Sequence, residues 1–492
     1  MANAHSSPSA ASEGYERLSG LAREYDQYDG LGLAELIAKK QITPMELLNA
    51  VRERVEVVNP KLNPLCHIFF EKAEAQIHEN LGTGPFRGVP FVLKDLGIYM
   101  KGTITSAGGR VWKEALADLD STLVTRYKQA GLVIFGKTNT PELGLTTTTE
   151  SVLFGETRNP WNPEKTSGGS SGGSAVVVAS RILPMAHASD GGGSIRIPAS
   201  CCGVFGFKPT RGRVPLGPMQ FEGWNGLAHQ HALTISVRDS AALLDATAGQ
   251  ELGSLYFAPK PARPFLSELD SDPGSLRIAL VMTTVNGTPV DAECKQAAIE
   301  AAKLCEGLGH KVEELTLPLG AEQLYGAFLP VFQVSTARIL EDAGTKRGRP
   351  VTQEEVETVT WGTAEAGWRV SSVAYSRAIA SLHQIGLTMA KVLESRDVVL
   401  SPTLAKPPVP LGLLRLTQEL ATWGHEVGAF SPYTALYNVT GQPSMSVPLS
   451  WSGEGLPIGV MFSGRFGEDA LLFRLGRQLE KAQPWKDRKP KI

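Results

Sequence analysis

Hydrophobic and polar residues follow helical spacing in the first part of the chain. Residues 31–40 place leucine and isoleucine three and four positions apart, which predicts an amphipathic helix. Thr43 and Glu46 then match a capping box, with a proline at the first helical position. This pattern predicts a second helix over residues 45–58, which the Asn-Pro pair ending at Pro60 should terminate.

Short apolar runs then alternate with helical segments. Residues 88–94 form an apolar run bounded by Gly and Pro and closed by Lys94, which is typical of a buried strand. A helix over residues 121–130 and an apolar strand over residues 132–135 follow. The same alternation returns over residues 175–183, 238–248, 276–282, 291–308 and 311–314. It predicts an α/β fold in which helices are layered on a sheet.

The composition is that of an ordinary globular protein, with 42% hydrophobic and 20% charged residues. Lys and Arg number 48 and Asp and Glu number 50, so the formal net charge is −2. Because this balance produces no basic field, we expect neither nucleic acid nor a membrane surface as a partner. We also find no apolar stretch of the about 18 residues that a membrane helix needs.

The cysteines and the N-terminal residues indicate the compartment. None of the five cysteines stands in a CxxC pair or another metal-ligand spacing, which favours a reduced, intracellular protein. Residues 1–14 lack the basic start and apolar core of a secretory signal. We therefore expect a cytoplasmic protein, with a flexible segment over residues 1–20 and a single domain over residues 21–492.

Residues 131–138 match the spacing of a phosphate-binding loop, G-x-x-x-x-G-K-[ST]. Such a loop must expose successive backbone N–H groups to phosphate. The four residues between the glycines are apolar and should bury their amides in a sheet, and Pro141 follows closely. We therefore interpret this run as a strand and not as a nucleotide site.

Residues 169–173 fit the nucleophile elbow G-x-S-x-G of α/β-hydrolases, which would make Ser171 the nucleophile. An elbow requires a strand directly before it and a downstream Asp and His. The preceding residues 159–166 contain two prolines and do not suit a strand. The elbow stays an alternative without supporting context.

His229 and His231 would lie on one side of an extended segment, where they could form a metal pair. No third ligand stands nearby in the sequence, so structural histidines explain them better. We expect no metal site.

Three further segments form one constellation. Lys94 ends its apolar run, a Gly/Ser run covers residues 167–174, and Asp-Gly-Gly-Gly-Ser-Ile-Arg-Ile-Pro covers residues 190–198. In this order and with these flanks they resemble the amidase signature family. The resemblance extends over residues 88–213 and resumes at residues 400–403 and 438–443.

The resemblance implies a catalytic triad. Carried onto the matching positions, Lys94 would be the general base, Ser170 the bridging serine and Ser194 the nucleophile. In relatives the peptide bond before the bridging serine is cis, which here is Gly169–Ser170. The resemblance also implies a mixed central β-sheet sandwiched between helical layers, and no cofactor.

The chemistry explains these residue types. A serine hydroxyl becomes a nucleophile only when a base removes its proton, and lysine can do so only if its pKa falls from its reference value near about 10.4. Burial of Lys94 in its apolar strand would lower that pKa. Asp95 would oppose the shift, so we expect its carboxylate to face elsewhere. Ser170 can accept one hydrogen bond while donating another and would relay the proton.

The glycines before the nucleophile let the backbone turn tightly. The N–H groups of the turn can then point at one spot and hold the oxyanion of a tetrahedral intermediate. We assign this oxyanion hole to Gly191, Gly192, Gly193 and Ser194.

Supporting residues and pocket walls complete the prediction. Asp190 and Arg196 should pair behind the loop, and Ser171 should hydrogen-bond Lys94. The substrate pocket should draw further walls from residues 320–423. Its nearest walls are assigned to Gly144, Thr146 and Ile195.

Within the family, residues 196–213 are most similar to the 6-aminohexanoate-cyclic-dimer hydrolases. The resemblance implies an amidase that passes through an acyl-enzyme on Ser194 and releases a carboxylic acid and an amine. Its partner would be a small amide, with cyclic, aryl and carbamate substrates all open, as is a homodimer. An alternative is the amidase subunit of a glutamine-dependent tRNA amidotransferase, although Arg211 stands where those subunits usually carry tyrosine. A catalytically dead scaffold is disfavoured, because the set of Lys94, Ser170 and Ser194 is complete.

Overall fold

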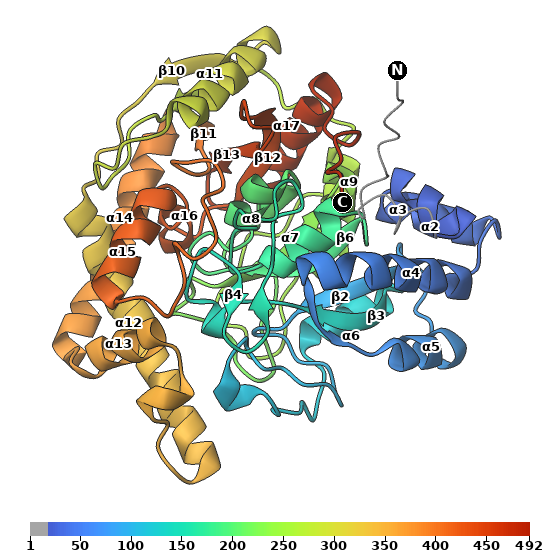
Figure 1. Ribbon diagram of the computed structural model, residues 1–492. Helices are drawn as coiled ribbons and strands as arrows, with labels where there is room; N and C mark the ends of the chain where they lie inside the picture. Colours follow the sequence, from blue (N-terminus) through green and yellow to red (C-terminus); the bar gives the residue numbers. More distant parts are fainter. Residues whose placement is uncertain (1–17) are drawn as a thin grey trace, which may run out of the picture.

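The largest sheet of the computed structural model has eight strands in the order β10-β9-β11-β13-β12-β7-β8-β6 (Figure 1). Strand β9 runs parallel to β10 and to β11, whereas the other neighbouring pairs are antiparallel, so the sheet is mixed as expected. The strands are β6 (Met185–Asp190), β7 (Phe205–Lys208), β8 (His229–Thr234), β9 (Arg277–Leu280), β10 (Lys311–Glu314), β11 (Val398–Pro402), β12 (Ser444–Trp451) and β13 (Pro457–Gly464).

The structure describes residues 18–492. Residues 1–17, most of the segment predicted to be flexible, lie outside the described residues, and the division into this segment and one domain stays a prediction. Over the described range, no helix has the length and apolar character that crossing a membrane would require.

A smaller sheet has the order β1-β3-β2. It consists of β1 (Leu65–Ile68), β2 (Pro90–Lys94) and β3 (Val133–Thr138). The backbone N–H of Lys94 at the end of β2 donates to Nδ1 of His187 on β6, over 3.0 Å. This side-chain bond joins the edge of the small sheet to the edge of the large one.

Helices cover both faces of the large sheet. Side chains alternate between the two faces along each strand, and buried side chains emerge on both. On β7, Phe207 stacks on Phe473 of α17 (Asp469–Ala482) at 4.2 Å between ring centroids. The intervening Gly206 faces α8 (Arg196–Cys202), where a Cβ atom would lie 2.6 Å from Ala199. The layered α/β architecture predicted from the sequence is confirmed.

The remaining helices lie around this frame. Helices α12 to α15 gather at the left of the view in Figure 1. The bounds are α2 (Gly20–Glu24), α3 (Gly30–Ala38), α5 (Phe70–Glu79), α6 (Thr122–Gln129), α7 (Gly172–Ala179), α9 (Val237–Thr247), α10 (Phe265–Glu268), α11 (Ala292–Gly307), α12 (Ala321–Arg347), α13 (Thr358–Trp368), α14 (Ser372–Glu394), α15 (Leu420–Phe430) and α16 (Leu436–Val439); β4 (Glu150–Ser151) and β5 (Gly155–Glu156) form a short hairpin.

The helix predicted over residues 45–58 begins as expected and ends later. In α4 (Pro44–Leu62), Thr43 and Glu46 form both bonds of the capping box. The prediction was wrong at the other end, because the helix passes through Pro60. This proline lies in the last turn, and the helix closes only at Asn63, which has a left-handed φ of 52° and donates its N–H to the carbonyl of Asn59 over 2.8 Å.

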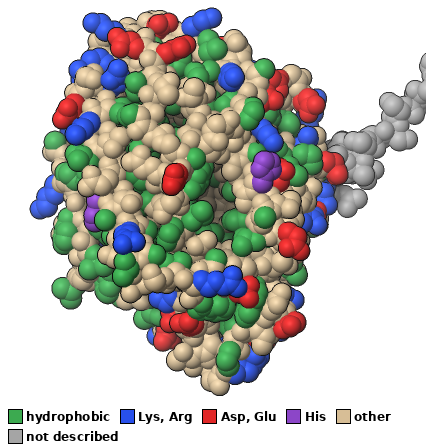
Figure 2. Space-filling view, turned by 90° about the vertical axis from the view of Figure 1, so that its left-hand side faces the viewer, with side chains coloured by type: hydrophobic (Ala, Val, Ile, Leu, Met, Phe, Trp, Pro, Cys, Tyr) green, Lys and Arg blue, Asp and Glu red, His purple; other side chains and the backbone are tan. Residues whose placement is uncertain are grey.

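The surface above helices α12 to α15 is electrically mixed. Figure 2 looks onto this side of the molecule and shows side chains of both signs scattered over it, not gathered into one patch. A hollow near the centre is bordered mainly by hydrophobic and neutral groups, with one acidic side chain beside it.

Candidate active site

Lys94 is fully buried at the end of β2. Its Nζ atom lies 2.7 Å from Oγ of Ser170 and 3.0 Å from Oγ of Ser189. Burial lowers the pKa of Lys94 to about 7, although the carboxylate of Asp190 acts in the opposite direction. A substantial fraction of this amine is therefore neutral near pH 7, as a proton acceptor must be.

Asp95 faces away from the amine, as expected. Its carboxylate accepts the backbone N–H of Ser106 at 3.1 Å and lies 3.8 Å from Nζ of Lys137. Lys137 belongs to β3 and is itself buried, so the two charges compensate each other inside the protein.

Ser170 lies next to Lys94 and next to Gly144, a residue that lines a large cavity. The Gly169–Ser170 peptide bond is cis, which confirms the expectation. The Ser170 carbonyl accepts the hydroxyl of Thr140 over 2.9 Å. A Cβ atom on Gly144 would lie 3.0 Å from Oγ of Ser170, so a glycine here, with φ of 68°, lets the loop approach the bridging hydroxyl.

The hydrogen bond predicted between Ser171 and Lys94 is not formed. The Ser171 hydroxyl donates instead to the carbonyl of Ser189, over 3.1 Å, and the hydroxyl of Ser189 contacts the amine. Ser171 turns away because it is the residue directly before α7. Ser189 was missed, although it stands next to the quoted motif that begins at Asp190.

Ser194 lies between β6 and α8, where its side chain lines the cavity. Among the hydrogen bonds of the described residues, none joins Ser170 to Ser194. The contact expected between Lys94 and Ser170 is therefore present, whereas the expected contact between Ser170 and Ser194 requires the Ser194 hydroxyl to turn toward Ser170. Catalytic hydrogen bonds often tighten only when substrate binds.

The nucleophile loop is held by Asp190. One carboxylate oxygen accepts the N–H of Gly193 at 2.8 Å, and the other accepts the N–H of Ile195 at 3.0 Å. The predicted oxyanion hole is therefore corrected at Gly193, whose N–H is already used. The N–H groups of Gly191, Gly192 and Ser194 stay assigned to the oxyanion.

The predicted pair of Asp190 and Arg196 is formed. Nη2 and Nε of Arg196 reach the two carboxylate oxygens at 2.8 and 3.0 Å, and both side chains are fully buried. Burial alone would raise the pKa of Asp190, but the guanidinium of Arg196 holds it well below its usual range. The loop is thus anchored by a desolvated, bidentate ion pair.

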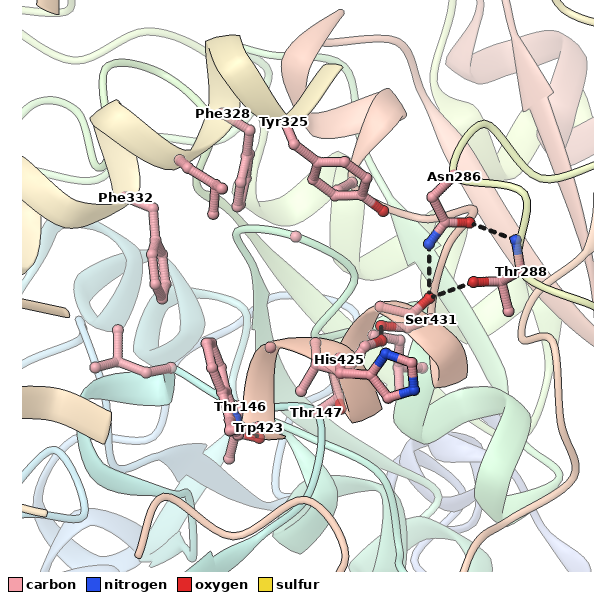
Figure 3. Close-up of a pocket in the computed structure, with 18 of the residues that line it drawn as sticks. Thr146, Thr147, Asn286, Thr288, Tyr325, Phe328, Phe332, Trp423, His425 and Ser431 are labelled. Carbon is pink, nitrogen blue, oxygen red and sulfur yellow. Dashed lines mark hydrogen bonds between the residues drawn. The ribbon is translucent and has the colours of Figure 1, made fainter. Parts of the chain in front are cut away.

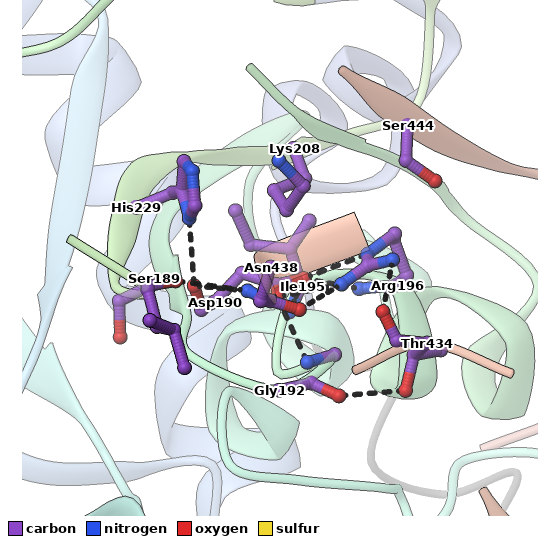
Figure 4. A network of polar contacts seen from close by, with 12 residues as sticks. Ser189, Asp190, Gly192, Ile195, Arg196, Lys208, His229, Thr434, Asn438 and Ser444 are labelled. Carbon is purple, nitrogen blue, oxygen red and sulfur yellow. Dashed lines mark hydrogen bonds and ion pairs between the residues drawn. The ribbon is translucent and has the colours of Figure 1, made fainter. Parts of the chain in front are cut away.

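Two residues far along the chain complete this network, and sequence reasoning assigned neither a role (Figure 4). Nδ2 of Asn438 donates to the carboxylate of Asp190 at 2.8 Å and to its carbonyl at 2.9 Å. The hydroxyl of Thr434 donates to the carbonyl of Gly192 at 2.6 Å. Asn438 begins a segment that already resembled the family, and this resemblance was the available signal.

The cavity in front of Ser194 has a volume of about 710 Å³ (Figure 3). Gly144 and Thr146 line it as predicted. Residues from 320–423 also line it as expected, among them Phe332 and Trp423. The prediction that Ile195 lines the cavity was wrong. Ile195 is fully buried and packs against Gly206 of β7, and the isoleucine that lines the cavity is Ile197.

The motifs set aside have structural roles. Within residues 131–138, Val133–Thr138 form β3, so this run forms no phosphate loop. Loop residues, not a strand, precede Ser171. His231 contacts Oγ of Ser240 at 2.8 Å and His229 contacts the carbonyl of Asp190 at 3.4 Å.

One group of possible metal ligands was not expected from sequence spacing. Cys66, His67 and Asp95 each place a ligand atom within 4.8 Å of the others. The carboxylate of Asp95 already pairs with Lys137, whose ammonium would oppose a cation there.

Comparison with known proteins gives consistent matches. The family model described as Amidase matches residues 46–473. The 6-aminohexanoate-cyclic-dimer hydrolases of Pseudomonas sp. (strain NK87) and Paenarthrobacter ureafaciens are each 38% identical over 94% of this chain and 96% of their own length. A solved 6-aminohexanoate cyclic dimer hydrolase complexed with substrate is 36% identical, with a TM-score of 0.89 over 94% of this chain and 99% of that chain.

Proposed function

Since the chain is an amidase that belongs to the amidase signature family, we propose that it hydrolyses the C–N bond of small amides with Lys94 as base, Ser170 as relay and Ser194 as nucleophile. The observation that carries this proposal is the buried amine of Lys94, 2.7 Å from Oγ of Ser170, which in turn lies next to Gly144, a residue that lines the same cavity as Ser194. The steps below use only these side chains and water.

In the first half-reaction, Oγ of Ser194 attacks the amide carbonyl carbon. The hydroxyl proton of Ser194 passes to Ser170, while the proton of Ser170 passes to neutral Lys94. The carbonyl oxygen becomes negative, and the N–H groups of Gly191, Gly192 and Ser194 stabilise it. The amide nitrogen then receives a proton back along the same path, the C–N bond breaks, and the amine leaves.

In the second half-reaction, water attacks the ester on Ser194. Its proton returns through Ser170 to Lys94, the carbon–oxygen bond to Ser194 breaks, and Ser194 recovers a proton. The products are a carboxylic acid and an amine. Because the network around Asp190 fixes the loop, little reorganisation accompanies either step.

The substrate proposal rests on the relatives. Cyclic amides come first, because the relatives at 38% identity are named for a cyclic dimer, and aryl amides and carbamates follow as chemically related substrates. The subunit of a tRNA amidotransferase is not favoured, because the extensive similarity is to the cyclic-dimer hydrolases.

The test separates the triad from the elbow alternative. We expect Ser194→Ala and Lys94→Ala to lose at least about 1,000-fold in kcat on a cyclic amide dimer, as removal of a nucleophile or base does in serine hydrolases. Ser171→Ala is the matched control and should keep most of the activity. Acid quenching of the reaction with a slow carbamate substrate, followed by mass spectrometry of the digested protein, should locate the acyl group on the peptide that contains Ser194. Full activity in Ser194→Ala together with loss in Ser171→Ala would overturn the assignment.

A further inference from the structure

The wall of the cavity carries no fixed charge. Among the described residues that line it there is no Lys, Arg, Asp or Glu, and the titratable side chains are those of Tyr325 and His425. An ionised group on a bound substrate would lose its water without meeting an opposite charge, which is costly. The cavity therefore suits uncharged molecules.

Four aromatic side chains form one continuous wall. Trp224 meets Phe332 edge to face at 5.1 Å between ring centroids, Phe332 stacks on Phe328 at 5.9 Å, and Phe332 stacks on Trp423 at 6.4 Å. Nε1 of Trp423 donates to the hydroxyl of Thr146 over 3.0 Å, which fixes the position of this ring. The wall is thus a preformed apolar surface.

This wall reaches the reacting centre through Trp224. A Cβ atom on Gly191 would lie 2.8 Å from the Trp224 ring, and one on Gly192 would lie 3.6 Å from Phe328. The indole occupies the space that the missing side chain of Gly191 leaves free. Trp224 has a φ of 54°, a left-handed conformation that non-glycine residues rarely adopt and that the surrounding structure must hold.

The opposite end of the cavity is polar, and several of its polar groups already form hydrogen bonds within the protein (Figure 3). Nδ2 of Asn286 donates to the carbonyl of Gly428 at 3.0 Å, and Oδ1 of Asn286 accepts the N–H of Thr288 at 3.2 Å. The hydroxyl of Ser431 donates to the carbonyl of Val427 at 3.2 Å. These groups offer a substrate few free hydrogen-bonding positions, whereas the hydroxyl of Thr147, which also lines the cavity, is buried without a hydrogen-bond partner. Most of the contact with a substrate is therefore apolar, and the Thr147 hydroxyl is one free polar position.

We propose that this cavity accepts uncharged amides, including the cyclic amides proposed above, and favours among them those that carry an aromatic ring, which Trp224 contacts beside the scissile bond. The proposal rests on the function proposed above. Aromatic rings pack against such a wall edge to face or offset, with an advantage over a saturated ring of equal size. The ring can belong to the acyl or to the amine part.

The test compares matched amides in which methylene groups separate the ring from the scissile C–N bond. The ring then has little electronic effect on the reactivity of that bond. One set joins phenylpropanoyl, cyclohexylpropanoyl or carboxyphenylpropanoyl groups to methylamine, and a second set places the corresponding benzyl groups on the amine of an acetamide. We expect kcat/KM to favour phenyl over cyclohexyl about 5-fold. We expect it to favour phenyl over carboxyphenyl about 100-fold, because the carboxylate is buried without a partner.

Variants assign the selectivity to named residues. Trp224→Leu should reduce the phenyl preference to about 1, Trp224→Phe should restore most of it, and Trp368→Leu, on another part of the surface, should leave it unchanged. Leu329 lines the cavity and is 41% exposed, so an arginine at this position should not prevent folding. Leu329→Arg should raise kcat/KM for the carboxyphenyl amide about 10-fold, and the uncharged variant Leu329→Gln should leave that kcat/KM unchanged. Thermal melting checks that each variant is folded.

The outcomes distinguish this proposal from the proposed function. Equal kcat/KM for charged and uncharged amides, or an unchanged phenyl preference in folded Trp224→Leu, would overturn the selectivity and leave the triad intact. Hydrolysis that persists in Ser194→Ala would overturn the triad itself.

Discussion

At the scale of single residues, the proposed mechanism depends on a neutral Lys94 amine. Lys94 is surrounded by an apolar strand on one side and by two serine hydroxyls on the other. Burial lowers its pKa to about 7, whereas the reference value lies near about 10.4. Protonation would occupy the lone pair that must accept the proton of Ser170.

The first prediction is a pH dependence with a definite sign. Below about pH 7 the folded protein protonates Lys94, so kcat/KM should fall about tenfold for each pH unit lost and level off above about pH 7. Initial rates from about pH 5 to about pH 9 with an uncharged substrate measure this. His425→Gln is the control, because it removes the histidine that lines the cavity and should keep the same inflection. A flat profile over this range would contradict the assignment of Lys94 as base.

At the scale of elements, the junction between β2 and β6 positions the base. His187 accepts the backbone N–H of Lys94 on Nδ1, and its Nε2 lies 2.8 Å from Oε1 of Gln230 on β8. Burial lowers the pKa of His187 to about 3, so the ring is neutral, with Nε2–H as donor and Nδ1 as acceptor. The His187 side chain thus accepts the Lys94 N–H, as a backbone carbonyl of a neighbouring strand would do in a continuous sheet, and it joins the two sheets.

The second prediction tests this junction. His187→Ala leaves the buried N–H of Lys94 without an acceptor, which should cost about 2–4 kcal/mol of unfolding free energy and lower kcat about 10-fold. His231→Ala is the matched control, since that buried histidine contacts Oγ of Ser240 instead. Both variants should lose stability in denaturant titrations. If kcat falls equally in both, or in neither, His187 has no positioning role.

At the scale of the whole molecule, buried carboxyl groups connect helices α12 to α15 to the loop beside the active site. The backbone N–H of Glu357, before α13, donates to Glu142 over 2.8 Å, two residues from Gly144. Burial, and then the nearby carboxyl of Glu142, raises the pKa of Glu357 to about 8. One of its carboxyl oxygens is buried without a hydrogen-bond partner.

The third prediction concerns stability against pH. Because the folded-state pKa of Glu357 lies above its unfolded value, the unfolded chain loses the proton first, and stability should decline between about pH 4.5 and about pH 8. Glu357→Gln removes this ionisation and should be more stable than the wild type by on the order of 2 kcal/mol at about pH 8, with a smaller difference at about pH 5. Urea titrations at both pH values measure this, with Glu354→Gln as an exposed control. An equal difference at both pH values would contradict the ionisation.

Features that depend on neighbouring residues were predictable from the sequence alone. The capping box at Thr43, the buried strand ending at Lys94 and the helix α6 follow from patterns of a few neighbouring residues. The hydrogen bonds of the cap and the helix are local, and the strand shows itself by its short apolar run, although it pairs with the distant β3. The family was also predictable, because Lys94, Ser170 and Ser194 stand in motifs whose order and flanks are specific, and the roles of these three residues stay a prediction.

Tertiary structure alone decided which groups touch at the site. Ser189 instead of Ser171 contacts Lys94, and Ile197 instead of Ile195 lines the cavity, because a few backbone angles at the start of a helix set the direction of successive side chains. The partnership of Asp190 with Asn438 joins residues 248 positions apart, which no local pattern encodes. The sequence by itself therefore determined the fold class and the family and predicts the reacting groups, whereas the walls and supports of the site were decided only when distant segments packed together.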